Sequence, residues 1–169
     1  TEFSGWSRFL AGWIEPNWVR CANPRTPTRH YLSPLNADKS DDKPRMLVLP
    51  LTSQSAIIAE LRTPTVWQTA VKSPTLVVYR VDTGIDHGNG PISLVGTTDQ
   101  PGGTLTSDGV KITIKGINTS GVTIDISTGY DQNLAQATAQ QTITAEPESQ
   151  LDLMIRQIES NLSCISISP

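Results

Sequence analysis

The 169-residue chain has few charged residues, which make up 17% of its composition, and its Lys and Arg residues form no cluster. Its formal net charge of −3 leaves it without the basic footprint by which proteins bind a phosphate backbone. No apolar run is long enough to span a bilayer. These absences argue against nucleic acid as a partner and against a membrane span.

Histidine is scarce, and the residues that would mark a catalytic centre are missing. His30 and His87 are far apart, so they form no His-Glu-x-x-His motif, and no Gly-x-Ser-x-Gly sequence is present. A catalytic zinc takes three protein ligands and a positioned base, which this chain cannot supply in the usual form. We therefore predict no catalytic residue and no firm metal ligand in this chain.

The chain has only two cysteines, Cys21 and Cys164. Thr, Ser, Gly and Pro are plentiful beside the few charges, a balance typical of secreted, extracellular β-rich domains. Disulfides persist in such oxidising compartments. We expect a bond between Cys21 and Cys164, which would close a long loop and stabilise the fold by roughly 5 kcal/mol at most. Two unrelated thiols are the alternative.

Strand patterns dominate what is present. Residues 56–62 and 75–82 are rich in aliphatic and β-branched side chains and are bounded by Pro, Ser or Gly, which predicts the central strands of a sheet. Further strands are expected at 28–35, 45–51 and 92–95, and a hairpin at 110–115 and 122–127. The pattern predicts a mainly β fold, as an antiparallel β-sandwich-like domain.

Helices are expected near both ends. Apolar residues recur at helical spacing in 3–14, where Ser4 is a candidate cap and Pro16 would end the helix. An amphipathic helix is expected at 148–162, on a stripe formed by Leu151, Met154, Ile155, Ile158 and Leu162. We therefore divide the chain into a β-rich domain with its short N-terminal helix (1–127), a linker-like stretch (128–147), and a C-terminal helix and strand (148–169).

Each central strand carries opposite charges at its C-terminal end, Glu60 and Arg62 on the first and Arg80 and Asp82 on the second. Desolvating a lone charge beside a core costs on the order of several kcal/mol. We therefore predict structural ion pairs in which Glu60 or Asp82 binds Arg62 or Arg80.

The loop 82–91 offers Asp82, Asp86 and Asn89 as oxygen ligands for a hard cation such as calcium. The spacing differs from that of an EF-hand loop. A plain Gly-rich turn is the favoured interpretation, and a calcium cofactor is the alternative. The charged loop 36–44 has the same two interpretations, a solvated loop or a calcium site.

Three stretches of the chain carry motif-like residues in a fixed order. These are Trp6, Arg8, Leu10, Gly12 and Trp13 in 3–14, Glu60 and Arg62 in 56–62, and Val78, Tyr79, Arg80, Val81 and Asp82 in 75–82. In sequence and order they resemble the part that follows the catalytic zinc helix in secreted metallopeptidases of the immune inhibitor A and gametolysin types. The resemblance covers residues 1–127.

The resemblance implies a non-catalytic, C-terminal part of a secreted zinc metallopeptidase, because the zinc helix itself is not in this chain. Such a part would be structural or substrate-binding, with the catalytic portion of its own precursor as partner. The chain opens at Thr1 with neither Met nor a signal peptide, and we expect a processed piece of a longer precursor. The alternative is an extracellular adhesin-like or self-assembling surface or filament module without enzymatic activity, whose partners are copies of itself.

Overall fold

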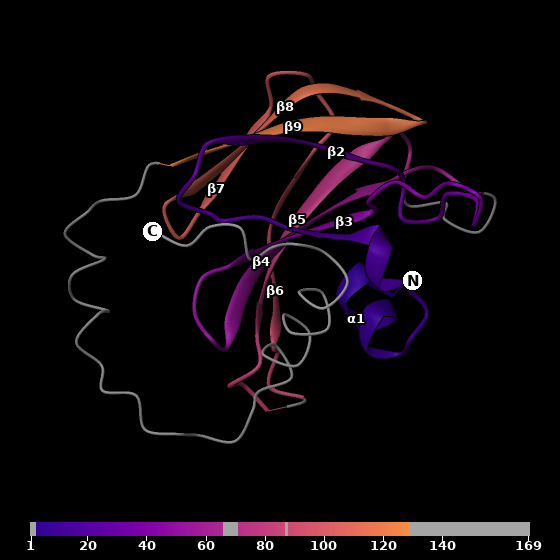
Figure 1. The fold of residues 1–169 in the computed structure, drawn as a ribbon. Coiled ribbons are helices and arrows are strands. Elements are labelled where there is room, and N and C mark those ends of the chain that lie inside the picture. Colours follow the sequence, from indigo (N-terminus) through magenta and orange to yellow (C-terminus); the bar gives the residue numbers. More distant parts are fainter. Residues whose placement is uncertain (1–2, 66–70, 87, 129–169) are drawn as a thin grey trace.

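The computed structural model describes residues 3–65, 71–86 and 88–128. These residues form a mainly β fold of two sheets with a short N-terminal helix (Figure 1). The elements in chain order are α1 (Gly5–Leu10), the 3-10 helix η1 (Pro16–Trp18), β1 (Val19–Cys21), β2 (Thr28–Leu32), β3 (Met46–Pro50), β4 (Ser55–Arg62), β5 (Thr75–Asp82), β6 (Ile92–Thr98), β7 (Thr104–Ser107), β8 (Val110–Asn118) and β9 (Gly121–Thr128). The prediction of a mainly β fold is therefore confirmed.

The first sheet has five strands in the order β1-β3-β4-β5-β6, and the second has four in the order β2-β9-β8-β7. The predicted central strands β4 and β5 lie side by side, with Ile58 opposite Tyr79 and Glu60 opposite Val77. All pairings between these strands are antiparallel except that of β1 with β3, which is parallel. The one parallel pairing lies at the edge of the first sheet, where the three-residue strand β1 follows η1 directly.

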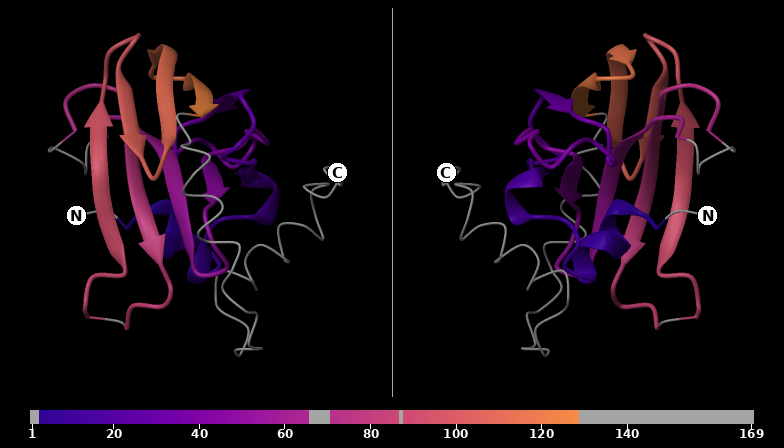
Figure 2. Two further views of the ribbon diagram at one scale, coloured as in Figure 1. Left: turned by 90° about the vertical axis from the view of Figure 1, so that its left-hand side faces the viewer. Right: turned by 90° about the vertical axis from the view of Figure 1, so that its right-hand side faces the viewer.

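Strand β4 lies between two apolar layers, and all eight of its residues are buried. One face, which includes Ile57 and Leu61, packs against the second sheet through residues such as Ile124. The other face, which includes Ile58, packs against Trp6 of α1 and the residues around it. Figure 2 shows the strands of the first sheet standing side by side, with α1 next to them. A strand covered on both faces needs a continuous apolar run, which is the pattern in its sequence.

Helix α1 is shorter than the predicted helix at 3–14. It ends at Leu10, and Gly12 adopts a φ of +72°, which suits glycine. The Gly12 N–H donates to the Phe9 carbonyl at 2.9 Å and the Trp13 N–H to the Arg8 carbonyl at 2.8 Å, the bonding of a Schellman ending. Trp6, Phe9 and Ile14 are buried, whereas Leu10 and Trp13 are exposed, so only part of the predicted apolar face packs on the sheet.

The elements expected in the C-terminal part of the chain lie outside the described residues. These are the linker-like stretch 128–147, of which only Thr128 in β9 is described, and the helix and strand at 148–169. No helix in the described part of the chain has the length and apolar character needed to cross a membrane.

Candidate functional site

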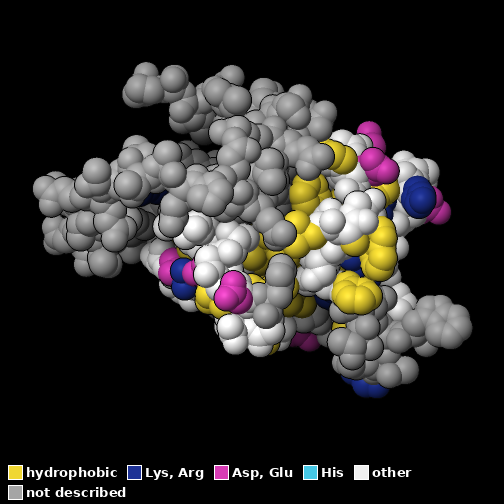
Figure 3. Space-filling view, turned by 90° about the horizontal axis from the view of Figure 1, so that it is seen from below, with side chains coloured by type: hydrophobic (Ala, Val, Ile, Leu, Met, Phe, Trp, Pro, Cys, Tyr) yellow, Lys and Arg dark blue, Asp and Glu magenta, His cyan; other side chains and the backbone are white. Residues whose placement is uncertain are grey.

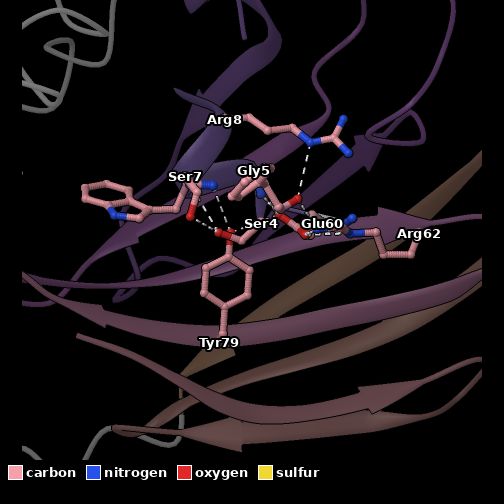
Figure 4. A network of polar contacts seen from close by, with 9 residues as sticks. Ser4, Gly5, Ser7, Arg8, Glu60, Arg62 and Tyr79 are labelled. Atoms are coloured by element: carbon pink, nitrogen blue, oxygen red, sulfur yellow. Dashed lines mark hydrogen bonds and ion pairs between the residues drawn. The ribbon is translucent and has the colours of Figure 1, made fainter. Parts of the chain in front are cut away.

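A buried polar cluster lies where α1 meets the outer face of β4 and β5 (Figure 4). Its centre is the carboxylate of Glu60, a residue with 0% exposure; Tyr79 and Arg62 are also buried. A carboxylate so far from solvent is stable only when it is paired and hydrogen-bonded. The residues around it therefore decide what this cluster does.

Both oxygens of Glu60 have partners. The Tyr79 hydroxyl donates to Oε2 at 2.9 Å, and the Gly5 backbone N–H donates to the same oxygen at 2.7 Å. The Arg62 guanidinium donates to Oε1 through Nε at 2.7 Å and forms an ion pair with it. The negative charge is thus met by one cation, one hydroxyl and one backbone amide, which offsets its desolvation.

The same cluster completes the N-terminus of α1. The first N–H groups of a helix have no partner within the helix, and three of those in α1 have one from elsewhere. Gly5 donates to Glu60, Trp6 donates to the Tyr79 hydroxyl at 3.1 Å, and Ser7 donates to the Ser4 side chain at 3.1 Å. Since six residues are too few for a stable isolated helix, α1 depends on these contacts and on its buried aromatic side chains.

Gly5 is required at the contact with Glu60. A Cβ atom at this position would lie 2.5 Å from Glu60 Oε2 and 3.0 Å from Met46 Sδ. The glycine therefore allows the backbone to approach the carboxylate closely enough to donate its N–H. Glycine is therefore needed at position 5 because of the close packing, and not because of its backbone conformation.

The segment before α1 is also tied to the sheet. Arg62 Nη2 donates to the carbonyl of Phe3 at 2.8 Å, and Arg8 Nε donates to the same carbonyl at 3.2 Å. Arg62 therefore links the Glu60 carboxylate to the backbone that enters the helix. Together these contacts form a clamp, which we define as Ser4, Gly5, Glu60, Arg62 and Tyr79.

The clamp shifts the titration of Tyr79. Burial raises the pKa of its hydroxyl well above the ordinary value, and the neighbouring charge of Glu60 raises it further. The phenol therefore stays protonated and keeps donating to Glu60. Every group of the clamp is engaged in holding α1, so its chemistry is that of binding and positioning a chain segment.

The remaining predicted ion-pair residues lie at the far end of β5. Arg80 Nη2 is 3.2 Å from Asp82 Oδ2, and both side chains are partly exposed. The other oxygen of Asp82 accepts from the Gly84 N–H at 3.1 Å. Of the four predicted residues, Glu60 and Arg62 thus form a buried pair, and Arg80 and Asp82 form a pair at the surface.

The described residues of the loop 82–91 make other contacts in the structure. Asp82 is used by Arg80 and Gly84, while the Asn89 N–H donates to the Asp86 carbonyl at 3.0 Å within a turn. Across the described ranges, no three His, Cys, Asp or Glu side chains gather in a way that would hold a metal. The plain turn stays the favoured interpretation, and calcium binding through Asp82, Asp86 and Asn89 stays its untested alternative.

The charged loop 36–44 is organised by an arginine. The Arg45 guanidinium donates to the carbonyls of Ala37 at 2.9 Å, Asp41 at 3.1 Å, and Asp38. It also stacks on Trp18, 3.7 Å from the ring centroid. Burial lowers the pKa of Arg45, while the nearby Asp41 and Asp38 oppose that shift. These three carbonyl oxygens of the loop thus already bind the positive charge of Arg45.

The predicted disulfide joins one described residue to one outside the description. Cys21 ends β1 and is partly buried against the apolar residues beneath α1. Cys164 lies outside the described residues, and no disulfide occurs within them. The bond between Cys21 and Cys164 stays a prediction.

Comparison with known proteins identifies no relative. Neither a protein-family model, nor a curated protein, nor a solved structure matches the chain.

Proposed function

We propose that this chain is a non-catalytic, structural portion of a secreted metallopeptidase-like protein, and that it holds the segment entering through α1 against its sheet. The clamp carries the proposal, because the carboxylate of Glu60 receives the backbone of that segment in a fully buried site. The anchored segment would be the junction with a catalytic portion.

The positions of the resembling residues support this proposal. The resemblance to the metallopeptidases rests on three stretches that are far apart in the sequence. Residues from all three meet in one cluster: Trp6 from the first, Glu60 and Arg62 from the second, and Tyr79 from the third. A shared contact gives a physical reason for these residue types to occur together.

The geometry of the clamp suits a positioning role. Three hydrogen bonds join side chains of the sheet to backbone atoms of Phe3, Gly5 and Trp6. A fourth, from the Tyr79 hydroxyl, holds the Glu60 carboxylate in place. Backbone contacts fix where the chain runs regardless of its side chains. A segment held in this way can fix the orientation of a preceding catalytic portion, because packed residues leave its backbone little room to move.

The coding sequence upstream of Thr1 and the metal content of the protein test the proposal. We expect a His-Glu-x-x-His helix encoded shortly before Thr1, and a longer protein that binds zinc and cleaves casein. The 169-residue chain alone should bind no stoichiometric zinc in elemental analysis and should leave casein intact. A signal peptide encoded directly before Thr1, or one tightly bound zinc in the isolated chain, would contradict the proposal.

The alternative is a self-assembling surface module. Strand β6 lies at an edge of the first sheet, and its sequence from Ile92 to Thr98 contains no charged residue and no proline. Charged residues and prolines are common devices that keep an edge from pairing with another strand. Sedimentation over a range of concentrations distinguishes the two functions, since a self-assembling module forms growing oligomers and a structural portion of a peptidase does not.

A further inference from the structure

Helix α1 packs over β4 and β5 of the first sheet, but the apolar side chains of the edge strand β6 on the same face stay exposed. The register pairs Tyr79 with Leu94 and Val81 with Ile92, which places these four side chains on one face. Tyr79 and Val81 are buried beneath α1, but Leu94 is 67% exposed and Ile92 is 38% exposed. The last strand of the sheet therefore presents apolar side chains with no described layer over them.

A groove runs between α1 and this open face. It has a volume of about 370 Å³, and its apolar lining includes Trp6, Leu10, Val81, Ile85 and Ile92. Leu10 is 45% exposed and Ile85 is 40% exposed, although both are apolar. Figure 3 shows hydrophobic side chains on the side of the molecule where the loop between β5 and β6 lies. Ser7, Thr83 and Asp86 give the groove a polar part beside these apolar side chains. An exposed apolar surface with polar residues around it marks an interaction site.

The chain contains a segment whose pattern and length suit this surface. The sequence of 148–162 places Leu151, Met154, Ile155, Ile158 and Leu162 on one face of a helix. A helix of 15 residues is about 22 Å long. The stripe from Leu151 to Leu162 covers about 17 Å of that length, and the seven residues of β6 span about 23 Å, so the open strand is long enough to carry the stripe.

The connection is long enough for this docking. The described chain ends at Thr128 in β9, and 19 residues separate it from Glu148. Extended, such a stretch spans roughly 60 Å, whereas a domain of this size has a radius of gyration of about 14 Å. A tethered segment also acts at an effective concentration in about the millimolar range, which favours it over a free partner.

We propose that residues 148–162 dock as an amphipathic helix in the groove between α1 and β6, with the Leu151–Leu162 stripe against Leu10, Ile92 and Leu94. The docked segment completes the apolar layer that α1 begins. The inference rests on the open face and the sequence stripe, and it holds whether or not the proposed function is correct.

Tryptic cleavage of the full chain after Arg156, followed by mass spectrometry, tests the docking. Docking protects this bond, so cleavage should be at least about tenfold slower than in a synthetic peptide of residues 148–162. Leu10→Asp and Ile92→Asp should each remove most of that protection. Both positions are already partly exposed, so the fold tolerates the change, and near-ultraviolet circular dichroism checks this.

Two controls make the test specific. Ser160→Asp adds the same charge on the opposite side of the predicted helix from the stripe, and Thr106→Asp adds it on β7 of the second sheet. Both should keep the protection, whereas Ile155→Asp should lose it. Equal cleavage of the chain and the peptide would overturn the proposal, as would protection that survives both groove substitutions. Protection that appears only at high protein concentration, together with a doubled mass in sedimentation, would assign the groove to a second copy instead and would also overturn it.

Discussion

Replacing Glu60 with Gln removes the charge at the centre of the clamp while keeping nearly the same shape. The Gln oxygen can accept from only part of the present donors, and its NH₂ group adds a donor where Tyr79, Gly5 and Arg62 already donate. Arg62 then loses the counter-charge of Glu60. Breaking a buried pair in this way costs roughly 3–5 kcal/mol, which corresponds to a fall in Tm of about 10–20 °C for a domain of this size.

Thermal unfolding followed by near-ultraviolet circular dichroism measures this effect, because Trp6 and Trp18 lie in the layer next to the clamp. The matched control is Asp125→Asn, the same change in the exposed pair that Asp125 forms with Arg29 at 2.6 Å, and its Tm should stay unchanged within error. The double variant Glu60→Gln with Arg62→Met should recover part of the loss, since it leaves no charged side chain in the clamp. If Glu60→Gln shifts the Tm no more than Asp125→Asn does, the clamp does not hold the helix.

Gly5→Ala tests the close contact with Glu60. We expect a loss of about 1–3 kcal/mol in urea unfolding from the crowded Cβ, and a gain in stability would instead show that the better helix propensity of Ala outweighs a loose contact. Tyr79→Phe tests the raised pKa of the phenol. Because the folded-state pKa lies above the unfolded value of about 10, the wild-type free energy of unfolding should be constant with respect to this group below about pH 10 and fall as the pH rises beyond it. Urea titrations between pH 8 and pH 11 should show a shallower fall for Tyr79→Phe, and identical slopes for the two proteins would argue against the shift.

Sequence reasoning works best here where one short-range pattern decides the structure. The apolar runs of β4 and β5 and the alternation in β8 and β9 predict those strands directly. The charges of Glu60 and Arg62 predict that a partner must exist, because an unpaired buried charge is too costly. The identity of the other partners is harder to predict, since Gly5 and Tyr79 reach Glu60 only once α1 crosses the sheet.

Other parts of the fold depend on contacts that no local pattern shows. Strand β1 has three residues and pairs in parallel with β3, and strand β7 has four residues of which only Leu105 is apolar, so neither is long enough to show a clear apolar pattern in the sequence. The end of α1 did have a local signal, because a glycine two residues after Leu10 favours a left-handed ending. Pro16 is farther along the chain, so the helix ends before that proline takes effect.

The position of β4 between two apolar layers bears on how this protein unfolds. If α1 left the sheet, the face of β4 that includes Ala56 and Ile58 would meet water; if the second sheet left, the face that includes Ile57 and Leu61 would do so. Neither layer can separate without weakening the strand on which the other depends. The two layers therefore share one cooperative transition, and a local opening of α1 draws on the stability of the whole domain.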